Sequence, residues 1–480
     1  MAETYKHGTY FGEVPTSILP PVTVAAPTVI FGTAPIHLAA EPADSNKPVL
    51  CSSYAEFVNQ FGFSNDFAKY TLCEAAYVFF ALYNVSPIIC VNVLDKTNHS
   101  KNGTKEVTGV TSAVTLTEPI LLDTLVVKSG TTPVTLVADT DYTAAHDSDG
   151  NVILTILDQT KITSDKVSLT YKEIDASAVT ASNIIGGIDN STGKKTGLEL
   201  IEEVYPRLGL IPGTIIAPKF STDSTVAAVM EAKCQNINGC FQTICAVDLN
   251  TSTVRKYSDC NEAKNQNNLV DNNLIVCYPK VSLGGVQYHL STQTAALMNL
   301  VDSQNDDIPY VSPSNHNLQC DKGCLADYTD IFLSKLEANY LNGIGIVTAL
   351  NFAGGWKCWG NRTSVYPSNS DPKDAFIPVR RMINWIGNTI VTTYFSKVDN
   401  PINKRLIETI TDSVQRWLNG LAARGVILGG RISFNATENP VTGLIDGIIK
   451  FHYHIGFCVP AREIESDLEF DPSYFSTLFG

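Results

Sequence analysis

The chain has 480 residues, of which 44% are hydrophobic and 17% charged, so it is long enough for two to four domains that each bury a core. Its 34 Lys and Arg residues against 48 Asp and Glu residues give a formal net charge of −14. This balance excludes a coat for nucleic acid, which needs positive charge to displace counterions. It favours solubility at high concentration or basic partners.

No segment is typical of secretion or membrane insertion. Residues 1–8 lack a basic stretch followed by an apolar core, so we expect no signal peptide. Residues 75–94 have membrane length, but Asn84, Ser86 and Pro87 interrupt them, which favours a buried helix followed by a strand. The twelve cysteines stand at irregular spacings, several in apolar runs, and we interpret them as reduced thiols.

Residues 1–20 are predicted to form an extended N-terminal arm, because Pro15 and the pair Pro20-Pro21 exclude a helix. Residues 21–97 then show the mixed pattern of an α/β layer. The elements predicted there are a strand at 22–31, a helix at 53–61 capped by serine, a helix at 74–82 and a strand at 88–94.

The composition changes near Asn98, and residues 98–174 are rich in Thr, Val, Ser and Asp in alternating runs. Asp147-Ser-Asp-Gly150 is a strong hairpin turn within them. Strands are predicted at 106–116, 121–128, 135–138, 152–156 and 166–171. This pattern predicts an all-β domain inserted into the α/β domain.

Alternating strands and helices return in residues 175–349. Helices are predicted at 197–205, 224–236, 282–298 and 327–339, and strands at 213–217, 243–248 and 274–278. Such alternation is typical of a partly parallel sheet covered by helices. We therefore expect residues 21–97 and 175–349 to form one α/β middle domain.

Residues 350–460 are predicted to form a C-terminal α+β domain. One helix is expected at 378–395, and a second begins at Asn400-Pro401, with Asn400 as N-cap, and ends at Gly425. Strands are expected at 431–435 and 448–457. Residues 461–480 mix acidic and apolar residues and are predicted to form an extended C-terminal arm.

The sequence contains no phosphate-binding loop and no nucleophile elbow, so we expect no enzymatic activity and no cofactor. His316, Cys320, Asp321 and Cys324 were considered as zinc ligands, but Cys-x3-Cys fits no zinc signature, which favours thiols in a loop.

Two further groups have a structural interpretation. Asp302, Asp306 and Asp307 favour a solvated polar loop over a calcium site. His452 and His454 alternate within a strand and share one face, which favours structural or interface histidines over a metal pair.

Several large side chains near the C-terminal domain are predicted to serve packing. Arg362 and the pair Arg380-Arg381 are expected to form buried or interface ion pairs. Trp356 and Trp359 are expected in the core or at a domain junction.

Five stretches occur in a recognisable order. They are His7-Gly-Thr-Tyr-Phe-Gly-Glu-Val-Pro15, Pro27-Thr-Val-Ile-Phe-Gly-Thr-Ala34, Asn46-Lys-Pro-Val-Leu50, Pro87-Ile-Ile-Cys-Val-Asn-Val93 and Trp359-Gly360-Asn361-Arg362-Thr363. With them, the chain resembles the sheath proteins of bacteriophage contractile tails and related injection machines. The last stretch is the most specific motif of the five. The resemblance covers residues 1–95 and 345–480 well, and the middle only by the order of its domains.

The resemblance implies a helical homopolymer around a tail tube, with baseplate and tail terminator proteins as further partners. It also implies that extended arms complete a β-sheet in neighbouring subunits, and that contraction drives the tube through a target envelope. The residues expected in strand exchange are Tyr10, Phe11 and Val14 of the N-terminal arm and Ile464, Leu468 and Phe470 of the C-terminal arm. The inserted β domain is expected to face outward. The expected location is the virion tail, assembled in the host cytoplasm, without contact with nucleic acid or insertion into a membrane.

Two alternatives remain open at this point. The chain could be the sheath of a headless particle such as a phage-tail-like bacteriocin. It could also be a cytoplasmic α/β enzyme using residues 282–324, which would require a clustered pocket and a small oligomer.

Overall fold

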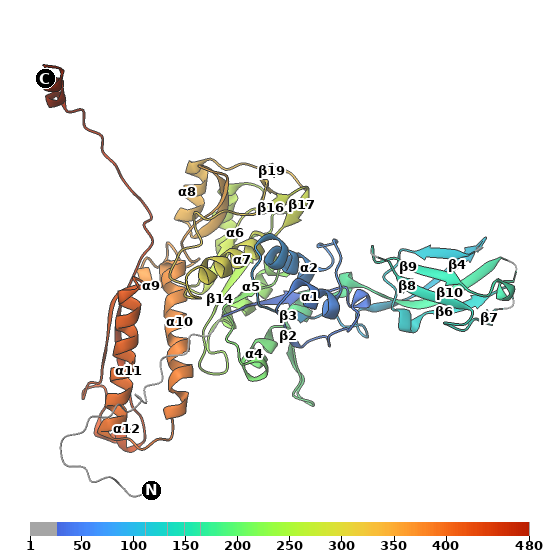
Figure 1. The fold of residues 1–480 in the computed structure, drawn as a ribbon, viewed down its shortest axis with the longest axis horizontal. Helices are drawn as coiled ribbons and strands as arrows, with labels where there is room; N and C mark the ends of the chain where they lie inside the picture. Colours follow the sequence, from blue (N-terminus) through green and yellow to red (C-terminus); the bar gives the residue numbers. More distant parts are fainter. Residues whose placement is uncertain (1–25, 111, 132, 148, 164, 480) are drawn as a thin grey trace, which may run out of the picture. The chain divides into compact units, whose positions relative to one another are not determined.

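The computed structural model describes residues 26–479 except residues 111, 132, 148 and 164 (Figure 1). The described residues divide into two compact units, one formed by 386–458 and the other by 26–385 with 459–479. The smaller unit thus begins at Ile386, whereas the sequence predicted a division at residue 350. The difference arises because β21 (Trp356–Trp359) pairs with β20 (Ile346–Asn351) and extends the sheet of the larger unit.

An eight-stranded sheet organises the larger unit, in the order β2-β3-β1-β13-β14-β15-β20-β21. The six inner strands are parallel, and the two edge strands run antiparallel to their neighbours. The other strand bounds are Thr28–Gly32 for β1, Pro48–Cys51 for β2, Ile88–Asn92 for β3, Thr214–Ile216 for β13, Ile244–Asp248 for β14 and Leu274–Cys277 for β15. All residues of β1, β3, β13, β14 and β15 are buried, as expected of parallel strands covered on both faces.

Helices of the larger unit flank this sheet, and α7 contacts its central strands β1, β13, β14 and β15 (Figure 1). The helices are α1 (Tyr54–Phe61), α2 (Thr71–Ala76, continuing as a π-helix over Tyr77–Leu82), α3 (Ala181–Ile185), α4 (Ile201–Leu208), α5 (Ser224–Ala232), α6 (Cys260–Gln266), α7 (Leu290–Ser303), α8 (Lys335–Gly343), α9 (Pro372–Ala375) and α10 (Ile377–Tyr394). Ser53 caps α1 as predicted, since its hydroxyl accepts a hydrogen bond from the Glu56 N–H at 3.2 Å. No helix of the described residues has the length and apolar character needed to cross a bilayer.

Two predicted helices of the larger unit were misplaced. The segment predicted as a helix at 282–298 begins instead with a hairpin of β16 (Lys280–Leu283) and β17 (Val286–Tyr288). Gly284 and Gly285 form its turn with φ angles of 58° and 83°, which side-chain-bearing residues rarely adopt. The helix predicted at 327–339 begins only at Lys335, after the cap residue Ser334. Strands β18 (Lys322–Cys324) and β19 (Asp330–Ile331) complete a small sheet with the hairpin.

Residues 100–174 form two further sheets around a core of their own. Their strands are β4 (Ser100–Thr108), β5 (Ala113–Leu116), β6 (Val126–Ser129), β7 (Val134–Thr135), β8 (Tyr142–His146), β9 (Val152–Ile156) and β10 (Lys166–Ile174). The single strand predicted at 106–116 is wrong, because Gly109, at φ 74°, separates β4 from β5, which lie in different sheets. Asp147 follows β8 as predicted for a hairpin, and its carboxylate accepts a hydrogen bond from the Asn151 N–H at 2.8 Å.

The smaller unit packs a β-hairpin against a long helix. Its elements are α11 (Lys404–Ala423), β22 (Ile427–Ser433), α12 (Val441–Ile445), β23 (His452–Phe457) and the end of α10. The N-cap of α11 is Asn403, not Asn400, since the Asn403 side chain accepts from the Leu406 N–H at 2.9 Å. A Cβ on Gly430 would lie 3.2 Å from Leu418, so the hairpin and α11 approach closely there.

Candidate inter-subunit surfaces

The C-terminal arm is the most exposed apolar segment of the described chain. Residues 458–471 form no helix or strand, and a 3-10 helix follows at Pro472–Phe479. The three residues predicted for strand exchange are open to solvent, with Ile464 84%, Leu468 100% and Phe470 76% exposed. Removing so much apolar surface from water is favourable, so a segment of this kind is stabilised when a partner covers it.

The tip of the arm adds a second apolar group. Tyr474, Phe475, Leu478 and Phe479 are all exposed, and the rings of Phe470 and Phe475 make an edge contact at 5.9 Å. The three residues predicted for exchange in the N-terminal arm, Tyr10, Phe11 and Val14, lie outside the described residues.

The β22–β23 hairpin is a two-stranded antiparallel sheet among the described residues. Such a sheet leaves backbone N–H and C=O groups along its edges that an added strand can bind. On β22, the Gln415 side chain donates to the Gly430 carbonyl at 2.9 Å and accepts from the Ile432 N–H at 3.2 Å. The side-chain amide of Gln415 thus takes the place of a neighbouring strand on β22. Among the described residues, this leaves β23 as the edge with room for an added strand.

The Trp359–Thr363 motif connects β21 to α10 through close backbone contacts. Gly360 has a φ of 140°, and a Cβ there would lie 2.7 Å from the Asn342 side chain. The Thr363 hydroxyl donates to the Asp374 carbonyl at 2.6 Å, and the Ile377 N–H donates to the Asn361 carbonyl at 3.0 Å. The motif therefore fixes where α10 begins.

Arg362 is bound by aromatic rings. Its guanidinium carbon lies 3.7 Å from the ring centre of Phe376 and 4.4 Å from that of Tyr366. The described residues of the single chain contain no ion pair of Arg362, so the buried alternative is not formed among them, and the interface alternative stays a prediction. Because a planar guanidinium stacks on aromatic faces, two rings hold this cation without a carboxylate.

A groove of about 600 Å³ lies beside this motif. Trp359, Arg362 and Lys335 of α8 line it together with the first residues of the arm, including Glu463 and Glu465. The other predicted tryptophan, Trp356, is buried, and its indole N–H donates to the Asp321 carbonyl at 2.8 Å.

The predicted ion pairs of the neighbouring arginines are present. The two guanidinium nitrogens Nη1 and Nη2 of Arg381 bind both carboxylate oxygens of Asp302, the first at 3.0 Å. Arg380 Nη1 lies 3.5 Å from Asp374. Asp302, considered above for calcium, is thus engaged by a cation of the chain.

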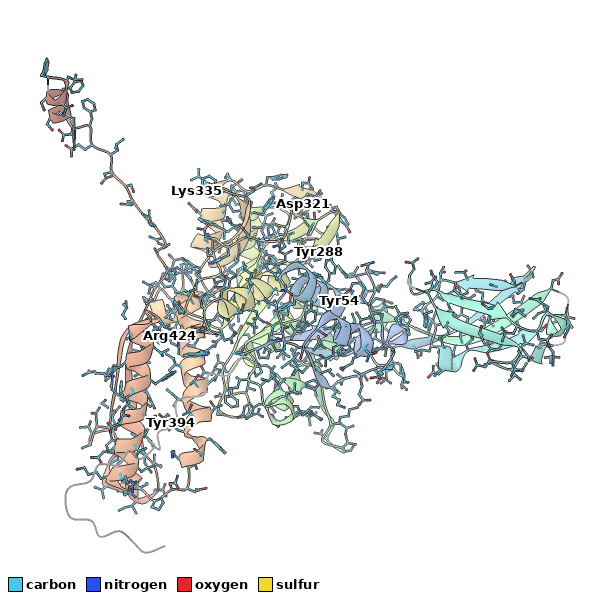
Figure 2. The ribbon with its side chains drawn as sticks, in the orientation of Figure 1. Tyr54, Tyr288, Asp321, Lys335, Tyr394 and Arg424 are labelled. Carbon is cyan, nitrogen blue, oxygen red and sulfur yellow. The ribbon has the colours of Figure 1, made fainter. Side chains whose placement is uncertain are left out.

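The residues considered as metal ligands do not gather. Asp321 accepts hydrogen bonds from the Ser282 hydroxyl at 3.0 Å and the Gly284 N–H at 2.8 Å, beside the small sheet (Figure 2). His452 and His454 share one face as predicted, with ring centres 4.3 Å apart. Within the described residues, no group of three or more His, Cys, Asp or Glu side chains could hold a metal ion.

One buried polar cluster was not predicted from the sequence. Glu74 Oε2 lies 2.8 Å from His289 Nδ1, and its other oxygen accepts from the His289 N–H at 2.7 Å. Beside it, Asp248 accepts from the N–H of Ser291 at 2.9 Å and from its hydroxyl. These four residues come from three distant segments, so no local motif in the sequence signals them.

The protonation states of the cluster follow from burial and charge. Burial opposes ionisation of Glu74, but His289 holds the pKa of this carboxyl below its ordinary value. Burial raises the pKa of Asp248. The cluster joins α2, β14 and the start of α7. Because all four of its side chains are buried, it is closed to a substrate.

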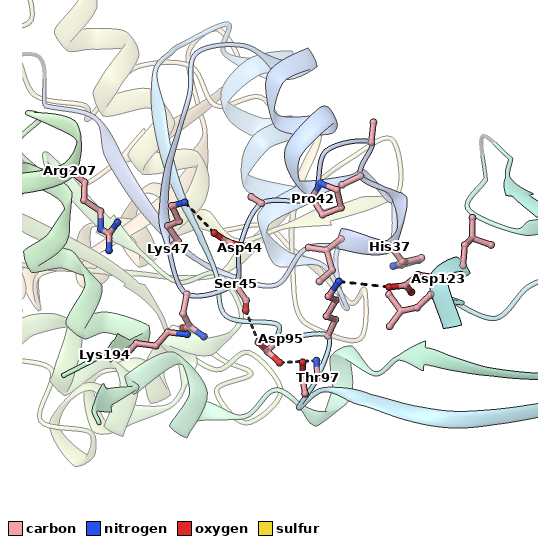
Figure 3. Close-up of a pocket in the computed structure, with 18 residues that line it drawn as sticks. His37, Pro42, Asp44, Ser45, Lys47, Asp95, Thr97, Asp123, Lys194 and Arg207 are labelled. Carbon is pink, nitrogen blue, oxygen red and sulfur yellow. Dashed lines mark hydrogen bonds and ion pairs between the residues drawn. The ribbon is translucent and has the colours of Figure 1, made fainter. Parts of the chain in front are cut away.

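A polar pocket of about 790 Å³ lies in the larger unit (Figure 3). Its charged residues pair within the chain, with Lys47 3.2 Å from Asp44 and Lys96 3.9 Å from Asp123. None of residues 282–324 lines it, although the enzyme alternative was based on that segment.

No family model matches the sequence. The tail sheath protein of Burkholderia phage BcepMu is 28% identical over 498 aligned positions, which cover 100% of both chains. The major tail sheath protein of Serratia phage KSP20 is 22% identical over 63% of this chain and 74% of its own length.

Solved sheath structures share the fold. The sheath of an extracellular contractile injection system, PVC, in its contracted state matches with a TM-score of 0.58 and 14% identity, over 99% of this chain and 100% of that one. The helical sheath of the anti-feeding prophage in its contracted state matches with a TM-score of 0.57 and 13% identity, over 98% and 99%. Sequence similarity along the whole of both chains, together with this shared fold, shows that the chain resembles the contractile tail sheath proteins.

Proposed function

We propose that this chain is the structural subunit of a contractile tail sheath, which polymerises helically around a tail tube and contracts to drive the tube through a cell envelope. The observation that carries the proposal is the similarity to a phage tail sheath protein over the full length of both chains. The contracted sheaths among the structural neighbours have the same fold.

Strand exchange links the subunits in this proposal. Ile464, Leu468 and Phe470 of the C-terminal arm, with Tyr10, Phe11 and Val14 of the N-terminal arm, add strands to the sheet of neighbouring copies. The exposure of the three C-terminal residues supports this role, as does the incomplete β22–β23 sheet. Residues 461–471, which precede the 3-10 helix of the arm, would span about 36 Å as a strand at about 3.3 Å per residue.

The remaining roles follow from membership of a sheath. The chain acts without catalysis or cofactor, and its partners are further copies of itself, a tail tube protein, and baseplate and terminator proteins. It works in the virion tail after assembly in the host cytoplasm. Two of its sequence relatives are proteins of phages, which favours a phage tail over a headless particle.

The test is electron microscopy of the purified chain in negative stain, with full-length protein beside a variant that lacks residues 461–480. We expect tubes or stacked rings from the full-length chain and folded monomers from the truncated one. Compact dimers or tetramers from the full-length chain would support an enzyme instead. Normal tubes from the truncated chain would refute exchange of the C-terminal arm.

A further inference from the structure

The two faces of the β22–β23 hairpin differ in chemistry. Tyr453, Ile455 and Phe457 alternate on the half-buried face of β23. On the opposite face, Arg431 of β22 stands directly across from His454 of β23, and His452 follows two residues away. All three side chains of this outer row, Arg431, His452 and His454, are exposed.

Charges already near the row do not neutralise it. Glu438 lies 3.0 Å from His452 Nδ1 and 3.6 Å from Lys450 Nζ, so one carboxylate serves two basic groups. Partial desolvation, then Arg431 and His452, lower the pKa of His454 below its ordinary value, and Glu438 opposes them. In the single chain the outer row is therefore short of negative charge.

The C-terminal arm carries the complementary pattern. Carboxylates stand at every second position, in Glu463, Glu465, Asp467, Glu469 and Asp471. Ile464, Leu468 and Phe470 occupy the positions between them. In an extended strand, successive side chains point to opposite faces, so all five carboxylates share one face and the apolar residues share the other.

Both patterns have the spacing of a β-strand. His452 and His454 are two residues apart, as are neighbouring carboxylates of the arm, and each such step spans about 6.6 Å. A strand beside β23 would place its side chains about 5 Å from those of β23 on the same face. Its apolar face would then continue the row of Tyr453, Ile455 and Phe457.

We infer that the acidic face of one copy's C-terminal arm docks along the outer row of a second copy's hairpin, as a strand added at the β23 edge. The inference rests on the proposed exchange of arms and specifies its acceptor edge, the face that each side chain takes, and the histidines as its charge partners. The β22 edge is the poorer acceptor because the Gln415 amide occupies its Gly430 carbonyl and Ile432 N–H.

Docking makes assembly dependent on pH. Carboxylates above the imidazoles stabilise the protonated form, so the pKa of His454 is higher in the assembled state than in the free chain. Protonation and docking therefore favour each other, and assembly weakens as pH rises through the range in which histidine titrates, about pH 5 to 8.

The experiment measures the critical concentration for tube formation by sedimentation at pH 6 and pH 8. For the wild-type chain we expect it to be about fivefold higher at pH 8, since each opposite-charge cross-strand pair contributes modestly. The double variant H452K/H454K keeps its charge and should assemble equally at both values. The variant H452E/H454E should fail to form tubes, and E465K/D467K in the same chain should restore them.

The outcomes separate this inference from the proposed function. Thermal melting of each variant shows whether it is folded, and H452K/H454K remains informative if H452E/H454E does not fold. If arm truncation abolishes tubes while every charge variant assembles like wild type at both pH values, the docking face is wrong and arm exchange stands. Tubes from the truncated chain would overturn both.

Discussion

At the scale of single residues, the Trp359–Thr363 motif is explained by packing. Gly360 lies where a Cβ would collide with Asn342, and Thr363 anchors the backbone ahead of α10. Arg362 supplies a planar cation that two aromatic rings cover. We propose that the motif serves this junction and not ligand binding.

Replacing Arg362 with lysine tests this role. Lysine keeps the charge but loses the flat stack on Phe376 and Tyr366, so we expect the free energy of unfolding to fall by about 1 kcal/mol. Chemical denaturation of the full chain provides the measurement. Arg255→Lys is a matched control, because Arg255 pairs with Asp327 on the exposed surface. Equal stability of the two variants would contradict the stacking role.

The buried pair of Glu74 and His289 gives a second prediction at this scale. Glu74→Gln leaves His289 without its carboxylate, and we expect a loss of about 3–5 kcal/mol at neutral pH. Because the pKa of Glu74 is held below 4.5, its contribution is present above that pH and is lost as pH falls through the lower folded value. Denaturation curves of both proteins are measured between pH 3 and 7, at steps of about one pH unit. The difference between their free energies of unfolding should shrink as the pH falls. A constant difference would show that Glu74 does not contribute through its charge.

At the scale of elements, the caps and turns decide where helices begin. Asn400-Pro401 has the residue types of a helix start, yet α11 begins three residues later, because the Asn403 side chain binds the Leu406 N–H. Asparagine is a preferred N-cap residue, so both positions suit the start of a helix. Only the path of the backbone decides which of the two side chains caps α11.

This pair provides a matched test. Asn403→Ala removes an N-cap and should lower the stability of the smaller unit by about 1 kcal/mol, whereas Asn400→Ala should leave it unchanged. Hydrogen exchange of the first turn of α11 detects the difference even if the two units unfold separately. Faster exchange in Asn400→Ala than in Asn403→Ala would show that the cap is misassigned.

At the scale of the whole molecule, residues 100–174 form a separate body within the larger unit. Their first and last strands pair, and Ser100 stands directly opposite Ile174. The chain therefore leaves the rest of the larger unit and returns to it at adjacent points. We propose that this region faces outward in the assembled sheath.

We predict that residues 100–174 can be replaced by a short Gly-Ser linker. The flanking sheet should fold, because the strand ends are already adjacent and the excised core is self-contained. Soluble expression, a cooperative thermal transition and tubes in negative stain are the expected results. Insoluble protein would show that the region supports the core. The contact between the rings of His37 and His146, at 5.6 Å, would then be the first interaction to restore.

Much of the fold follows from local sequence. Strands β1, β3, β13, β14 and β15 were predicted because parallel strands buried on both faces form continuous apolar runs. The helix α10 and the Ser53 cap of α1 were predicted for similar local reasons. The misplaced helix at 282–298 shows the limit of prediction from local sequence. Ser282–Met298 contains helix-forming residues, but its first part forms a hairpin that turns at Gly284-Gly285 and whose strand β16 also pairs with the distant β18.

The sequence by itself pointed to the resemblance to sheath proteins, through the order of its five motifs. It also predicted the α/β fold class, through the alternation of its apolar runs. It further gave the alternation of acidic and apolar residues in the C-terminal arm, which would form two faces if the arm docks as a strand. Only the tertiary structure decided that β21 belongs to the large sheet, that Glu74 meets His289, and that Arg362 stacks on rings. Each of these depends on contacts between residues far apart in the chain, and local periodicity carries no information about which distant segments meet.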